Sequence, residues 1–291
     1  MKRRAFLLSS LLLAMPAWAV AQKRFSRGLL WRVAKKGVAP SHVYGTIHVA
    51  DSRLAELPAK VRTAFDAARS LMLEFLPDAY AKERFLEAAL LPGQQTLQEI
   101  IGAEDFQRAV KHLQPAGVPP EFVNRLKPWG VLINLRNPRA AEGAPIDSRL
   151  AELARSRRMP IYQIEGVEEQ IFTFDEFPMD SQVALLKHSL AHSEELLALS
   201  DRTLDAYLSG NLAAIWRLRE QFVARHPEIA AHQAVMTKRV VYDRSVVMAF
   251  RMQRQLRRGE AFVALGALHL FGEKGVLALL ERDGYRATRV S

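Results

Sequence analysis

Residues 29–48, LLWRVAKKGVAPSHVYGTIH, decide the first part of the fold. Two short apolar and aromatic runs, 29–34 and 42–47, flank Lys35-Lys36-Gly37, and these three residue types favour a tight turn. The stretch therefore predicts a β-hairpin.

Strand and helix patterns alternate beyond this hairpin. Apolar residues recur at three- and four-residue spacing over 54–68, which predicts an amphipathic helix, and 71–73 (LML) has the character of a buried strand. Residues 147–158 predict a helix with Asp147 as its N-cap. The later predicted elements are a strand at 160–164, helices over 180–258, a strand at 261–265, a helix at 274–282 and a strand at 285–290.

These patterns predict the α/β (α+β) fold class. We expect one central sheet built from N- and C-terminal strand/helix units, with a largely helical insertion at about 79–258 between them. The strand near 160–164 interrupts this insertion.

Composition narrows the chemistry. The chain has 291 residues, of which 49% are hydrophobic, so it is neither a disordered nor a fibrous protein. It has no cysteine, which excludes disulfide scaffolds, thiolate metal sites and cysteine nucleophiles. Any metal ion must be held by His, Asp or Glu.

Residues 1–21 have the features of a cleaved signal peptide, which leaves 22–291 as the mature domain. A basic start is followed by a short apolar run and by A-x-A sequences. Arg3-Arg4 also resembles a twin-arginine signal. We expect a periplasmic or secreted protein, exported by the Sec or Tat route, with no integral membrane segment in the mature chain.

The mature chain is basic. Removal of the three basic residues within 1–21 lowers the formal net charge from +10 to +7. An exported protein rarely meets nucleic acid, and isolated basic clusters usually form a solvated helix face. We therefore expect no nucleic-acid partner.

Four ionisable residues follow predicted strands: His48, Glu74, Glu165 and His269. If helix 54–68 is a right-handed crossover, the strands on either side of it are parallel, and His48 and Glu74 share one sheet edge. If strands 160–164 and 261–265 run in the same direction as these two, Glu165 and His269 also lie at that edge. Ligands of open α/β sheets bind there.

Both histidines end a G-x-x-H sequence, Gly45 to His48 and Gly266 to His269. Two neutral imidazoles and a carboxylate make a site for a divalent transition metal, with coordination positions open to water. The alternative is that both histidines are hydrogen-bonded cleft or core residues.

Other histidines carry a weaker signal. His188 and His192 are four residues apart and share a helix face, as a metal-binding pair does. However, Ser189 stands where the glutamate of an HExxH motif would be. We expect a solvated helix face.

Several of these segments carry a family resemblance. Residues 30–33 (LWRV), 43–48 (VYGTIH), 73–74 (LE), 160–170 (PIYQIEGVEEQ), 262–270 (FVALGALHL) and 284–290 (GYRATRV) are similar to the TraB/GumN family. The resemblance covers nearly all of the mature chain. It implies relation to the Tiki proteins, described as metal-dependent proteases, within a superfamily that includes EreA-like and haem-binding ChaN-like proteins.

The resemblance also implies roles for individual residues. His48 and His269 would hold the metal, and Glu74 would be a third ligand or the base that accepts a proton from water. Arg244 would stabilise oxyanion charge or orient Glu74. The family often has Arg-Asn where this chain has Arg244-Ser245, so no role is expected of position 245.

Glu165 matches a family pattern. It would be a catalytic residue or would support one, or else a carboxylate stabilised by the dipole of the helix that follows.

Two functions remain open at this stage. One is an exported metal-dependent hydrolase, such as a peptidase, that uses Mn, Co or Zn on a peptide or envelope-derived substrate. The other is a non-enzymatic envelope binding protein that captures haem, a peptide or a glycan at the same cleft, with Tyr44 as a candidate haem ligand. The sequence leaves the oligomeric state open.

Overall fold

The computed structural model describes residues 25–49, 51–76, 78–135 and 144–290. The predicted signal peptide, 1–21, lies outside this part of the chain. The elements that precede the main helical region are β1 (Leu30–Ala34), β2 (Ser41–Thr46), the 3₁₀ turn η1 (Ser52–Leu54), α2 (Ala59–Asp66) and β3 (Ser70–Leu73).

The remaining elements are α3 (Ala79–Ala88), α4 (Leu97–Ile101), α5 (Ala103–Leu113), η2 (Gln114–Ala116), α6 (Pro120–Val123), α7 (Pro128–Leu135), α8 (Ile146–Ser156), β4 (Ile161–Gln163), α9 (Val167–Asp175), α10 (Met179–Ala191), α11 (Ser193–Leu208), α12 (Leu212–Arg225), η3 (Pro227–Ile229), α13 (Ala230–Thr237), the π-helix η4 (Lys238–Asp243), α14 (Arg244–Arg251), α15 (Gln253–Leu256), β5 (Ala261–Gly266), η5 (Ala267–His269), α16 (Val276–Arg282) and β6 (Arg286–Arg289).

The sheet has the strand order β4-β3-β5-β2-β1-β6. Strands β1 and β2 form the predicted antiparallel hairpin, with Trp31 opposite Val43. Strands β2, β5, β3 and β4 are parallel to one another, so their carboxyl ends lie at one edge. This confirms that the four strands run in the sense that the sequence predicts.

Strand β5 is the centre of this sheet. It pairs with β2 on one side and β3 on the other, and all six of its residues are buried. A strand covered on both faces needs a continuous apolar run, which the sequence AFVALG supplies. The two neighbours of this C-terminal strand both come from the first 73 residues.

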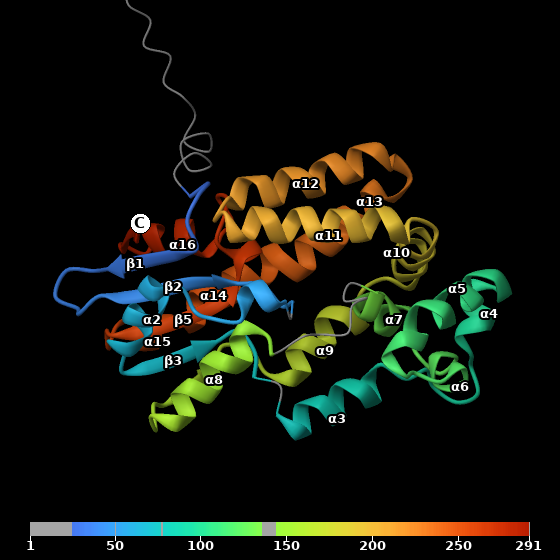
Figure 1. Cartoon of the computed structure of the whole chain (residues 1–291), viewed down its shortest axis with the longest axis horizontal. Helices are drawn as coiled ribbons and strands as arrows, with labels where there is room; N and C mark the ends of the chain where they lie inside the picture. Colours follow the sequence, from blue (N-terminus) through green and yellow to red (C-terminus); the bar gives the residue numbers. More distant parts are fainter. Residues whose placement is uncertain (1–24, 50, 77, 136–143, 291) are drawn as a thin grey trace, which may run out of the picture.

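Helices fill the chain between the strand units, which confirms the predicted fold class. Figure 1 shows the sheet at one end of the molecule, α4–α7 at the other, and α10–α13 along the top. The helical part has a hydrophobic core of its own, in which Trp129, Leu186 and Phe222 are buried.

Two local predictions need correction. The helix predicted over 54–68 is shorter, because α2 begins only after Pro58, and a residue before proline is disfavoured in helical conformation. Asp147 is not an N-cap, since α8 begins at Ile146 after Pro145 and Asp147 lies in its first turn. The carboxylate of Asp147 contacts the sheet edge instead.

The described helices include none that is long and apolar enough to cross a bilayer.

Phe262 gives a test of this architecture. Its ring is fully buried in β5, edge-to-face against Phe65 at 5.5 Å between centroids. We expect Phe262→Ala to lower the free energy of unfolding by about 3–5 kcal/mol, from lost burial and a residual cavity. Phe250, which is 78% exposed, is the matched control, and Phe250→Ala should cost less than about 0.5 kcal/mol. Equal urea midpoints for the two variants would contradict this packing.

Candidate metal centre

The carboxyl edge of the sheet brings His48, Glu74 and His269 together. His48 follows β2, Glu74 directly follows β3, and His269 ends the 3₁₀ turn η5 after β5. Glu74 Oε2 lies 3.8 Å from His48 Nε2 and 4.0 Å from His269 Nε2. Two imidazole nitrogens and one carboxylate oxygen thus converge on a small space.

The other ring nitrogen of His48 contacts Asp147. His48 Nδ1 lies 3.2 Å from Asp147 Oδ2, and the Thr46 hydroxyl donates to Asp147 Oδ1 at 3.0 Å. An ionised carboxylate only accepts hydrogen bonds, so Nδ1 carries the proton and Nε2 is the nitrogen available to a metal. Asp147 therefore orients the ring of His48.

His269 is oriented in the same way by Ser245. The Ser245 hydroxyl donates to the Val241 carbonyl at 2.7 Å and lies 2.9 Å from His269 Nδ1. Because its one hydrogen is used, the hydroxyl oxygen accepts from Nδ1–H, and Nε2 keeps a lone pair directed toward Glu74. Ser245 follows the π-helix η4, a wide turn of the kind that often occurs at functional sites.

Arg244 joins the two glutamates of the edge. Its guanidinium donates to Glu74 Oε1 through Nη2, and to Glu165 at 3.1 Å through Nε and 2.6 Å through Nη2. Gln170 also donates to Glu165, at 2.6 Å. All four side chains are buried.

The carboxylate of Glu165 contacts the side chains of Arg244 and Gln170, whereas Glu169 accepts from the Gly166 amide at the start of α9. Glu165 therefore holds the guanidinium of Arg244 in place.

The electrostatics of the centre favour a cation. Burial opposes ionisation of Glu74, but His48, His269 and Arg244 hold the pKa of this carboxyl well below its usual value. Burial raises the pKa of Glu165, and Arg244 only partly offsets this rise. When ionised, Glu74 and Glu165 share the single guanidinium of Arg244, which leaves one negative charge, and the carboxylate of Asp147 contacts His48.

The two histidines differ in their pKa values. Burial, assisted by Arg244, lowers the pKa of His269 to about 4. Desolvation acts to lower the pKa of His48 as well, but Asp147 and Glu74 outweigh it and raise this pKa well above 6.5. The His48 side chain is 58% exposed, so it is also the member of the centre that solvent reaches.

The residues present fit a divalent metal ion. A Cβ on Gly266 would lie 3.3 Å from Glu74 Oε2 and 3.5 Å from His48 Nε2, so glycine keeps this space open. A Cβ on Gly45 would instead lie 2.7 Å from Leu270 Cδ1. The two G-x-x-H glycines thus differ: Gly266 leaves room at the centre, and Gly45 allows close packing behind it.

Tyr44, the candidate haem ligand, is not part of this centre. Its side chain is buried, and its hydroxyl lies 3.2 Å from the Tyr207 hydroxyl. Nothing in this arrangement presents the tyrosine oxygen to a ligand.

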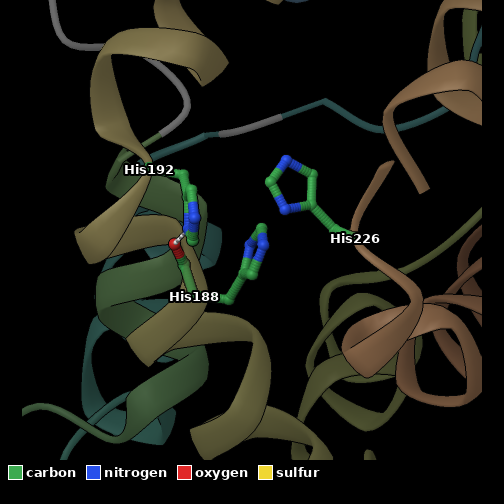
Figure 2. Close-up of side chains that lie close together, drawn as sticks. All are labelled: His188, His192 and His226. Atoms are coloured by element: carbon green, nitrogen blue, oxygen red, sulfur yellow. Dashed lines mark hydrogen bonds between the residues drawn. The ribbon is translucent and has the colours of Figure 1, made fainter. Parts of the chain in front are cut away.

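The sequence did not predict the contacts that Asp147 and Ser245 make at the centre, and the prediction for His188 and His192 was wrong. Asp147 and Ser245 act on histidines 99 and 24 positions away, and no local pattern marks either contact. His188 and His192 do not form a solvated face, because His188 is buried and both rings contact His226. Figure 2 shows these three rings together.

The fold and this edge define an α/β protein with a two-histidine, one-glutamate centre. Residues 29–289 match the family model described as the TraB/PrgY/gumN family, and the chain belongs to this family. No solved structure matches the chain.

Two kinds of relative are similar to the chain. The uncharacterized protein YbaP of Shigella flexneri is 26% identical over 82% of this chain and 87% of its own length. The metalloprotease TIKI2 of Danio rerio is 24% identical over 91% of this chain, which spans 61% of TIKI2. The metalloprotease TIKI2 of Xenopus tropicalis is also 24% identical. The chain thus spans less than two thirds of the length of each of these two TIKI2 proteins.

Asp147 provides a test of the centre. In Asp147→Asn, loss of the carboxylate charge should lower the pKa of His48 in the metal-free protein, and loss of ring orientation should weaken metal binding about 10- to 100-fold. The two readouts are the NMR titration of the His48 ring and calorimetric metal titration. Asp175→Asn, at the end of α9 and bonded to the Trp129 indole, is the matched control. An unchanged His48 pKa would contradict the contact.

Proposed function

We propose that this protein is an exported metal-dependent hydrolase, specifically a peptidase, with its active site at the carboxyl edge of β2, β3 and β5. One observation carries the proposal: both Nε2 atoms approach the same oxygen of Glu74, while both Nδ1 atoms are engaged by Asp147 and Ser245. The names of the Tiki relatives support a peptide substrate.

His48, His269 and Glu74 are the proposed ligands of the metal. A divalent transition metal supplies Lewis-acid polarisation of a carbonyl and activation of water near neutral pH. Imidazole and carboxylate ligands suit Mn, Co and Zn, and three protein ligands leave a coordination position open.

Glu74 acts in this proposal as a ligand and not as the base. Its Oε1 accepts from Arg244, its Oε2 accepts from the Gly266 amide at 2.8 Å, and its pKa is held well below the usual value. A carboxylate with these properties binds a cation well and accepts a proton poorly. Arg244 and Glu165 are positioning residues that fix the carboxylate of Glu74.

An adjoining pocket is the proposed site for the rest of the substrate. It has a volume of about 630 Å³ and is lined by Leu76 and Glu165 of the β3–α3 and β4–α9 connections, by Tyr80 of α3 and by Arg251 of α14. The pocket shares Glu165 with the centre, and Glu165 contacts Arg244. A peptide or envelope-derived chain that occupies the pocket can therefore extend toward His48, the exposed histidine.

The location of the protein is part of the proposal. Residues 1–21 have the basic, apolar and A-x-A regions of an export signal, which favours the periplasm or the exterior, by the Sec or Tat route. A protein in this location meets peptides and envelope-derived material, the substrate class proposed.

Substitution of both histidines tests the function. We expect His48→Ala/His269→Ala to lose metal from the sheet-edge centre and to lower peptide hydrolysis to the uncatalysed background. Hydrolysis would be measured on a fluorogenic peptide library after loading with Mn, Co or Zn. His112→Ala, a histidine on α5, is the control and should keep full activity. Activity that survives in the double variant would overturn the proposal, and tight metal binding without hydrolysis would favour the binding-protein alternative.

The pKa values of the two histidines predict how metal binding depends on pH. At pH 5.5 the metal-free protein carries a proton on His48 but none on His269, because their pKa values lie well above 6.5 and at about 4. Metal must displace the His48 proton, so its affinity should fall about tenfold per pH unit as pH falls below the His48 pKa.

Two ordinary histidines, each with a pKa near 6.5, would behave differently. At pH 5.5 they would together release nearly two protons, whereas we expect about one from this centre. Calorimetric titration in buffers of different ionisation enthalpy measures this number. A release of two protons would contradict the asymmetry.

A further inference from the structure

Three histidines cluster in the helical part of the molecule. His188 lies near the end of α10, His192 at the corner between α10 and α11, and His226 at the end of α12. The rings of His188 and His192 stack at 4.2 Å between centroids, and His226 lies 4.5 Å and 4.6 Å from them. Figure 2 shows the rings facing a common space.

One ring nitrogen from each histidine lies within 4.8 Å of the other two. His192 Nδ1 donates to the His188 carbonyl at 3.0 Å, which leaves Nε2 with a lone pair. His226 Nε2 lies 2.8 Å from Glu195 Oε2, which leaves Nδ1 available in the neutral ring. A carboxylate behind the histidine is the usual arrangement around metal-binding imidazoles.

His188 supplies an independent observation. Its side chain is 6% exposed, and its Nε2 is buried with no hydrogen-bond partner. Glu228 Oε1 is 3.3 Å away but not in hydrogen-bond geometry, and the same oxygen lies 3.4 Å from His226 Nδ1. Buried polar groups are normally paired, so this nitrogen requires an explanation.

Aromatic packing alone does not supply that explanation. Phe222 contacts the rings of His188 and His226, at 5.6 Å and 4.7 Å between centroids. Such contacts would account for three flat rings in a core, but they leave the His188 nitrogen unpaired. Burial and the two neighbouring rings also lower the pKa of His188, which favours the neutral form that binds metals.

We propose that His188, His192 and His226, with Glu228 as the fourth ligand, bind one divalent ion of the zinc type. Four protein ligands close the coordination sphere, as in structural and not catalytic zinc sites. Tetrahedral coordination with Zn–N distances near 2.1 Å sets ligand nitrogens about 3.4 Å apart. The nitrogens now lie within 4.8 Å of one another, and the stacked rings of His188 and His192 must turn so that both nitrogens point to one ion. The bound ion ties the α10–α11 corner to the end of α12.

The experiment separates this site from the sheet-edge centre by working in the His48→Ala/His269→Ala background. The untagged mature chain is incubated with Zn²⁺ or Co²⁺, desalted and analysed for metal by plasma mass spectrometry. We expect one equivalent, with the visible absorption of tetrahedral cobalt. Addition of His192→Gln and His226→Gln should reduce the metal to less than a tenth. The matched control, His112→Gln/His232→Gln in the same background, should retain one equivalent.

A second variant keeps the test informative if the helical substitutions unfold the chain. The Glu228 side chain is 58% exposed, so Glu228→Gln leaves the packing intact. This variant should bind Zn²⁺ at least tenfold more weakly and should lose most of the zinc-dependent rise in Tm. Absence of metal from the background protein, or zinc binding unaffected by these substitutions, would overturn the proposal. The outcome is independent of whether the sheet-edge centre is catalytic.

Discussion

The buried ion pairs between Arg244, Glu74 and Glu165 are the constraint on which the sheet edge depends. One guanidinium donates to two carboxylates that follow β3 and β4, and it comes from a helix far along the chain. Removal of Arg244, or of Glu74 and Glu165, would leave a buried charge without its partner, which strongly destabilises the folded state. The strand ends and α14 are therefore held in one relative position.

The same helix also controls His269. Arg244 and Ser245 are consecutive, so a single turn of α14 fixes both the carboxylate of Glu74 and the ring of His269. The π-helix η4 immediately before this turn carries Val240 and Val241, whose carbonyls accept from Arg244 and Ser245. Asp147 provides the equivalent support for His48 from α8. Support of this kind fixes which ring nitrogen faces the centre.

The sequence could predict features that depend on local pattern and on strand direction. The hairpin, the strand of residues 261–265 and the placing of His48 and Glu74 at one edge follow from apolar runs and a parallel crossover, and Glu165 and His269 join them if their strands run in the same sense. The sequence could not predict contacts between residues that only the folded chain brings together. Asp147 looked like a helix cap because its neighbours suit one, and the His188–His226 contact depends on the end of α12 reaching the end of α10.

The position of β5 also shapes how the chain can be synthesised. Its neighbours β2 and β3 are complete by Leu73, whereas β5 begins at Ala261, about 190 residues later. At about 5–20 residues per second, a ribosome needs roughly 10–40 s to cover that interval. During this time two strand edges lack their partner and can pair with other chains. The nascent protein thus depends on chaperones, or on rapid collapse of its helices, until β5 emerges.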